Sequence, residues 1–230
     1  MKFERNHLYH IYNQGNNRER VYYTKQNYLF FISKIRECFS QYVDILAWCL
    51  MPNHFHLMVY IKSTETVVQS ERENDNSMIK RSLNNSIAIL LRSYTNTINR
   101  EQGRTGSLFR QKTKAVCLDP DNGFMPAWYT VTGLTKINYQ NDDSQYPQMC
   151  FNYIHNNPVV SGLVKDISSW EYSSVPELLG LVETNLINRK RVEEFGLKLY
   201  PSDEPIGSAD PIGSYLPQLP FSFPEQEHCP

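Results

Sequence analysis

Two histidines separated by a single residue, His54 and His56, are the side chains of this sequence best suited to hold a metal ion. They lie in the β-rich run 54–61 (HFHLMVYI), and the side chains of a strand alternate between its faces, so both imidazoles are expected on one face. Imidazole is the commonest transition-metal ligand, and a rigid strand would pre-organise the pair for a divalent ion. The same pattern also arises by chance on a solvent-facing sheet surface.

A tyrosine and an asparagine that suit phosphoryl chemistry beside such a metal lie four residues apart in the run YIHNN. At that spacing Tyr153 and Asn157 are neighbours on one face of a helix. The Asn157 amide oxygen would complete the ligands of the metal, and the Tyr153 phenol would attack a phosphate that the metal orients. The chain has 15 tyrosines, most of which must pack or lie at the surface, so the spacing alone does not single out Tyr153.

Hydrophobic periodicity predicts the elements that position the histidines. Thr24 is suited to cap a first helix, and Pro52-Asn53 marks a tight turn between two antiparallel strands. The predicted elements are a strand at 7–14, a helix after Thr24 with core residues Tyr28, Phe31, Ile32, Ile35 and Phe39, strands at 43–51 and 54–61, a loop at 63–77, a helix with core residues Leu83, Ile87, Leu90, Leu91, Tyr94 and Ile98, and a short strand at 113–118.

The second half of the chain is predicted to hold the tyrosine on one short helix. Residues 119–146 are rich in Asp, Asn and Pro and are interpreted as an insertion-like loop. Pro147 suits a first helical turn and Pro158 is expected to end the helix near Asn157. After it, Trp170 and Tyr172 are predicted to anchor the chain on the core. A last helix is predicted at 189–200, and the tail 201–230, with seven prolines, is predicted to be extended or disordered.

The charge of the chain is divided unevenly along its length. The net charge is −1, but residues 1–117 hold 17 Lys and Arg against 9 Asp and Glu, and residues 118–230 hold 6 against 15. This split indicates a polyanion-binding body with an acidic extension. We therefore expect one catalytic domain at 1–200 and a separate tail at 201–230.

Other sequence features indicate a soluble cytoplasmic protein that does not enter a membrane. The sequence has no apolar run of about 18 residues and its N-terminus lacks the apolar stretch of a secretory signal. The cysteines are odd in number and form no CxxC pair, so we expect them to be reduced and structural. They are Cys38, Cys49, Cys117, Cys150 and Cys229.

Several separated motifs, taken in order, closely resemble the REP-associated tyrosine transposases, which are relatives of the insertion-sequence transposases that move as single strands. The motifs are YHIYNQGNN near the start, WCLMPNHFHLMV around the histidines, RTGSLFRQK, YIHNNPVVSGLV and WEYSS, and they cover roughly residues 7–175. The resemblance implies the fold of the HUH endonucleases and transposases, an α+β ferredoxin-like antiparallel sheet backed by helices. The predicted strand-helix-strand-strand-helix-strand order agrees with that fold.

The resemblance also implies an activity. Mg²⁺ or Mn²⁺ would be held by His54, His56 and Asn157, and Tyr153 would cleave and rejoin single-stranded DNA through a 5'-phosphotyrosine. The partner would be DNA with a hairpin, and the protein would work as a monomer or a homodimer. The family pattern assigns no role to the loop at 119–146 or to the proline-rich tail.

Basic and aromatic residues near these motifs are candidates for contacts to DNA. Cationic side chains would bind phosphates, and an exposed ring would stack on a base. Each cation is individually as well explained as a solvated surface charge, and the cluster carries more weight than any member. The candidates are Arg18, Arg20, Arg104, Arg110, Lys112 and Lys114, with Tyr12 or Phe109 for stacking.

Two other functions remain open from the sequence. A metal-dependent phosphoesterase would use His54, His56 and a carboxylate, and would leave no covalent protein–DNA adduct; the absence of a motif such as HExxH disfavours it. A domesticated hairpin-binding protein without transposition would bind DNA equally well after loss of the tyrosine. The intact set of candidate residues disfavours that second alternative.

Overall fold

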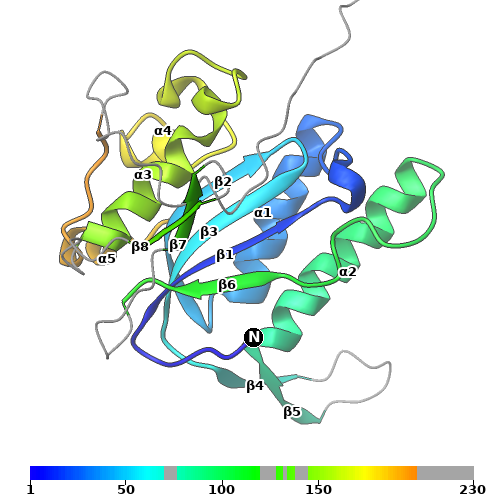
Figure 1. The fold of residues 1–230 in the computed structure, drawn as a ribbon. Coiled ribbons are helices and arrows are strands. Elements are labelled where there is room, and N and C mark those ends of the chain that lie inside the picture. The colour runs from blue at the N-terminus through cyan, green and yellow to red at the C-terminus, as the bar shows by residue number, and fades with distance from the viewer. Residues whose placement is uncertain (70–76, 120–127, 132–133, 138–144, 201–230) are drawn as a thin grey trace, which may run out of the picture.

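A four-stranded antiparallel sheet forms the centre of the protein (Figure 1). The computed structural model describes residues 1–69, 77–119, 128–131, 134–137 and 145–200. The strands are β1 (Leu8–Gln14), β2 (Val43–Met51), β3 (His54–Ile61) and β6 (Lys114–Cys117), in the spatial order β2-β3-β1-β6. Together with the two helices between them, they give the ferredoxin-like α+β fold expected from the sequence.

Two helices, α1 (Lys25–Phe39) and α2 (Leu83–Glu101), cover one face of the sheet. Thr24 caps α1 as predicted, because its side chain accepts a hydrogen bond from the Asn27 N–H and the Asn27 side chain bonds back to the Thr24 N–H. Phe31 and Tyr94, from the two helices, pack in one cluster with Phe55 of β3. Among the described helices, none is long and apolar enough to cross a membrane.

The opposite face of the sheet is covered by α3 (Gln145–Val160), with α4 (Val175–Leu178) and α5 (Arg189–Glu194) beside it (Figure 1). Phe151 and Ile154 of α3 pack in a second core with Met58 of β3. A bulge between Ile45 and Ala47 shifts the register of β2 against β3 and places two successive side chains of β2 in this second core. The sheet therefore lies between two helical layers.

Two segments predicted as loops contain strands instead. Within 63–77, β4 (Glu65–Gln69) pairs with β5 (Met78–Ser82), because the β-branched run TVV suits an exposed hairpin despite its polar neighbours. Within 119–146, β7 (Trp128–Val131) pairs with β8 (Leu134–Ile137). The remainder of 120–144 and the tail 201–230 lie outside the described residues.

The ends of two helices also differ from the prediction. Helix α3 runs through Pro158 to Val160, since a proline in the last turn removes only one helical hydrogen bond, and the chain then turns at Gly162, which has a φ of 72°. Helix α5 ends at Glu194 rather than near residue 200, where Gly196 follows with a φ of 62°. Both ends are glycine caps whose position the periodicity of apolar residues did not reveal.

The anchoring of the chain after α3 is confirmed. The Trp170 indole N–H donates to the Leu50 carbonyl at 3.1 Å, and the Tyr172 ring stacks on Tyr28 at 3.7 Å between centroids. The cysteines that the structure describes are unbridged, with Cys49 and Cys150 buried and Cys38 and Cys117 half-buried.

A buried hydrogen-bonded group fixes α3 to the sheet. His155 of α3 is buried, and its Nε2 lies 2.6 Å from the Ser174 Oγ. The same Oγ accepts from the Trp48 N–H of β2 at 2.9 Å. This group anchors α3 at His155, two residues along the chain from Tyr153. It therefore sets the distance between the tyrosine and the sheet.

Ser174→Ala should therefore lower the free energy of unfolding by about 1–3 kcal/mol, because it leaves buried polar groups without a partner. Urea denaturation followed by circular dichroism measures the change, with Ser40→Ala at an exposed position as the control. Equal stability of the two variants would show that this group does not secure α3.

Candidate metal and tyrosine site

The structure places His54 and His56 on the sheet face that α3 covers. Their ring centroids lie 4.9 Å apart, with an angle of 85° between the rings. Phe55, between them, points into the core on the α1 and α2 side. In the register of β1 against β3, Gln14 lies opposite His54 and Tyr12 lies opposite His56. The alternation of the strand thus brings the two imidazoles together as the sequence predicted.

The His54 ring is oriented by its neighbour in sequence. Its Nδ1 lies 2.6 Å from the Asn53 Oδ1, which accepts only, so Nδ1 carries the proton. The Asn53 amide is held in turn by donation to the Arg18 carbonyl at 3.2 Å. In this tautomer the lone pair is on His54 Nε2, which is buried and has no hydrogen-bond partner among the described residues. Metal-binding histidines are held in the same way by an acceptor behind the ring.

His56 is oriented by a residue that the sequence analysis did not single out, His10 of β1. The His10 Nε2 lies 2.9 Å from the His56 Nδ1, and both rings are buried. Donation from His56 Nδ1 to His10 leaves the lone pair on His56 Nε2, which likewise has no partner within the described part of the chain. The available signal was the alternation of His10 and Tyr12 in strand β1, but only the register with β3 reveals the contact.

The three imidazoles are neutral near pH 7. Burial lowers the pKa of His10 to about 3 and that of His54 to about 4, and at His54 the nearby Asn157 side chain opposes the effect because it favours the protonated ring. Burial also holds the pKa of His56 well below its usual value of 6.5, and the neighbouring His54 and His10 add to that effect. Neutral imidazole is the form that binds a metal, so no proton has to be displaced at physiological pH.

Helix α3 brings the tyrosine and the asparagine to the histidines. The Tyr153 ring lies 5.3 Å from His56 and 6.1 Å from His10, edge-on to both. Asn157, one turn further along, donates its amide N–H to the Tyr153 carbonyl at 3.3 Å, which leaves its amide oxygen for another contact. Tyr153 and Asn157 are half-buried as whole residues, but the Tyr153 hydroxyl and the Nε2 atoms of the two histidines are buried beneath α3.

This donor set fits a divalent metal ion. Two unpartnered imidazole nitrogens, from His54 and His56, and the Asn157 oxygen could provide three ligands, and the ion would take its remaining ligands from other molecules. An apolar core would not leave two buried nitrogens without partners, since each such group costs about 1–3 kcal/mol.

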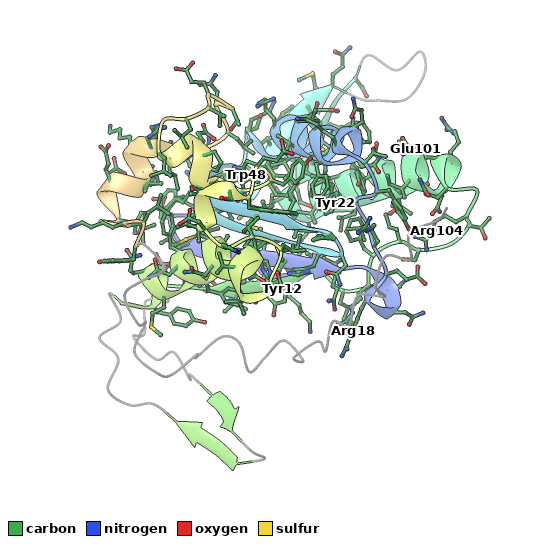
Figure 2. The ribbon with its side chains drawn as sticks, turned by 90° about the horizontal axis from the view of Figure 1, so that it is seen from above. Tyr12, Arg18, Tyr22, Trp48, Glu101 and Arg104 are labelled. Atoms are coloured by element: carbon green, nitrogen blue, oxygen red, sulfur yellow. The ribbon has the colours of Figure 1, made fainter. Side chains whose placement is uncertain are left out.

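The predicted DNA-contacting residues fall into two groups. Arg18 and Arg20 are exposed beside the short 3₁₀ helix Asn16–Arg18, and Arg104, at the same end of the molecule in Figure 2, pairs with Glu19 at 3.1 Å. Arg110, Lys112 and Lys114 are exposed. With Arg92 of α2, they line a groove of about 910 Å³ between α2 and the segment 107–115.

The two aromatic candidates differ in accessibility. Tyr12 is half-buried on the α3 side of the sheet, away from Trp48 and Tyr22 in Figure 2, and stacks on His10 at 4.8 Å. Phe109 is 4% exposed and packs against Phe31 in the core. A base cannot stack on Phe109 in this conformation, and Tyr12 is the more accessible of the two rings. The sequence could not separate the two, because each follows one apolar residue and precedes a polar one.

Comparisons with known proteins give one structural match. A solved structure described as a REP-associated tyrosine transposase bound to a REP hairpin is similar to this chain, with 16% sequence identity over 81% of this chain and 85% of that one. The TM-score is 0.47. No protein-family model and no curated protein matches the sequence.

Loss of the acceptor behind His56 should weaken metal binding. His10→Phe keeps a ring in the buried space but cannot accept the Nδ1 proton, so the affinity for Mn²⁺ should fall about 10–100-fold. His10→Gln retains an acceptor and should lose less. Titration with Mn²⁺, followed by the electron paramagnetic resonance of the free ion, measures both. Unchanged affinity in both variants would remove His10 from the site.

Proposed function

We propose that this protein is a metal-dependent transposase or endonuclease of single-stranded DNA that cleaves and rejoins its substrate through a covalent tyrosine link. The observation that carries the proposal is the convergence of His54, His56, Tyr153 and Asn157, from two elements about a hundred residues apart, on one site between β3 and α3. The motif order in the sequence, which resembles the REP-associated tyrosine transposases, supports the same reading. A structural role would not need two buried imidazole nitrogens without partners.

In the proposed reaction the Tyr153 oxygen attacks a backbone phosphorus. The bond from oxygen to phosphorus forms as the bond to the 3' oxygen breaks, giving a 5'-phosphotyrosine and a free 3'-hydroxyl, with the phenol proton passing to the leaving oxygen or solvent. The phosphodiester energy is retained in the covalent link, so a second 3'-hydroxyl can reverse the step without ATP.

The residues of the site have separate roles in this proposed reaction. A bound Mg²⁺ or Mn²⁺ would neutralise charge on the phosphate. His54, His56 and Asn157 would hold that ion, and His10 and Asn53 would hold the two imidazoles in the ligating tautomer. The group formed by His155 and Ser174 fixes α3, and so keeps the Tyr153 ring edge-on to His56.

The substrate we propose is single-stranded DNA that carries a hairpin. Arg110, Lys112 and Lys114 give the groove beside α2 its cationic character, which suits a phosphate backbone. Tyr12 offers an accessible ring next to the site for an unpaired base.

Tyr153→Phe tests the covalent step directly. The variant keeps the ring and its packing but lacks the attacking oxygen. Wild-type protein with labelled single-stranded hairpin DNA and Mg²⁺ should give an adduct that survives denaturation, and Tyr153→Phe should give none while binding the hairpin with similar affinity. Tyr60→Phe, on the same strand as the histidines and bonded to Asn6 instead, is the matched control and should form the adduct normally.

Peptide mapping of the adduct identifies the nucleophile among the 15 tyrosines. An adduct that persists in Tyr153→Phe would assign the nucleophile elsewhere. Cleavage by the wild type without any adduct would favour a phosphoesterase, and hairpin binding without cleavage would favour a non-catalytic binding protein.

His56→Ala should abolish cleavage and leave hairpin binding largely intact. The substitution removes a metal ligand, so the cleavage rate should fall by more than about 100-fold, while DNA affinity rests on phosphate and base contacts elsewhere. Excess EDTA should have the same effect on the wild type, with recovery on adding Mg²⁺ or Mn²⁺. Full activity in EDTA would exclude a metal from the reaction.

A further inference from the structure

A second group of metal-ligating side chains lies at the other end of β1, outside the site described above. His7 precedes β1, and Cys117 and Asp119 lie at and just beyond the end of β6. One ligand atom of each residue lies within 4.8 Å of the other two. The side chains of His7 and Asp119 are 13% and 27% exposed, so the group is enclosed on most sides and open to one further ligand.

Two distances within this group match a tetrahedral zinc site. His7 Nδ1 lies 3.5 Å from Asp119 Oδ1, and Cys117 Sγ lies 3.7 Å from the same oxygen. Tetrahedral angles with ordinary zinc bond lengths place nitrogen and oxygen about 3.3 Å apart and sulfur and oxygen about 3.5 Å apart. The Asp119 oxygen therefore lies within a few tenths of an ångström of the required separation from each of the other two ligand atoms, which are themselves within 4.8 Å of each other.

Neighbouring groups hold these ligands in place. The Leu8 N–H donates to Asp119 Oδ1 at 2.7 Å, which fixes the carboxylate against β1. The Tyr9 hydroxyl accepts from the Glu4 N–H and hydrogen-bonds the Cys117 side chain. Such contacts behind the ligands orient a metal site and strengthen its ligands. One bond opposes binding, because His7 Nδ1 lies 2.9 Å from the Asp119 carbonyl and would have to give up that contact.

This group is separate from the histidines beneath α3. Cys117 lies opposite Tyr9 in the β1–β6 register, three residues along from the Tyr12–Lys114 pair, a distance of about 10 Å along a strand. Tyr9 belongs to the core on the α1 and α2 side, whereas His56 faces α3. The two groups thus occupy opposite faces of the sheet.

We propose that His7, Cys117 and Asp119 form a structural Zn²⁺ site, with water as the fourth ligand. The thiolate favours Zn²⁺ over Mg²⁺, which prefers oxygen ligands. The site joins the start of β1 to the end of β6, an edge strand of four residues that pairs with β1 only, across more than a hundred residues of sequence. Closing so long a loop would stabilise the placement of the last strand of the sheet.

Cobalt spectroscopy tests the proposal, because a cysteine ligand to Co²⁺ gives a sulfur-to-metal charge-transfer absorption in the near ultraviolet that nitrogen and oxygen ligands do not give. Full-length protein with reduced cysteines should develop this band with one equivalent of Co²⁺, and Zn²⁺ should displace it. The band should persist in His54→Ala/His56→Ala, so its presence does not depend on the proposed transposase site. It should be lost in Cys117→Ser and unchanged in Cys38→Ser, the other half-buried cysteine.

Two further variants and a melting experiment complete the test. His7→Gln and Asp119→Asn should each weaken Co²⁺ binding by at least about tenfold. In the His54→Ala/His56→Ala protein, Zn²⁺ should raise the melting temperature, and adding Cys117→Ser should remove that increase. A wild-type protein without the band, or a band that survives Cys117→Ser, would overturn the proposal and show that the three side chains form a hydrogen-bonded group only.

Discussion

The burial of neutral imidazoles between the sheet and α3 is the constraint on which the site depends. A buried imidazole must be hydrogen-bonded or be a ligand, because an unpartnered polar atom costs about 1–3 kcal/mol. One nitrogen of His10 is hydrogen-bonded to one nitrogen of His56, and one nitrogen of His54 is hydrogen-bonded to the Asn53 side chain. Each of His54 and His56 still leaves one nitrogen without a partner in the described chain. This face of the sheet therefore holds two imidazole nitrogens, each with a lone pair that a metal ion could accept.

Helix α3, in the second helical layer, adds Tyr153 and Asn157 to this face of the sheet. Helix α3 could not approach the sheet closely over polar rings without anchors of its own. The bulge in β2 turns two successive side chains toward the helix, and His155 bonds Ser174 against β2. These anchors fix the helix at the positions on either side of Tyr153, so the phenol ring faces the histidines while it also packs against the second core.

Most of the fold and part of the site could be predicted from the sequence. The strands around His54 and His56 and the capped helix after Thr24 follow from local patterns, and the motif order indicated Tyr153 and Asn157. His10 could not be recognised, because its role depends on strand register between residues 46 positions apart. The burial of Phe109 also depends on packing, and the short β4–β5 and β7–β8 hairpins have too few residues to give a clear period.

The two proposed sites differ in their ligand atoms, and this difference is enough for them to bind different metals. The site under α3 offers imidazole nitrogens and an amide oxygen beside a half-buried tyrosine, which suits the divalent ion of the proposed phosphoryl transfer. The group at the end of β6 offers a cysteine sulfur and is mostly enclosed, which suits a tightly held ion with no catalytic exchange. Because β1 contributes to both, His10 on one face and Leu8 and Tyr9 beside the other, its register must be maintained for either. A metal that secures β6 against β1 would thus also stabilise the strand that orients His56.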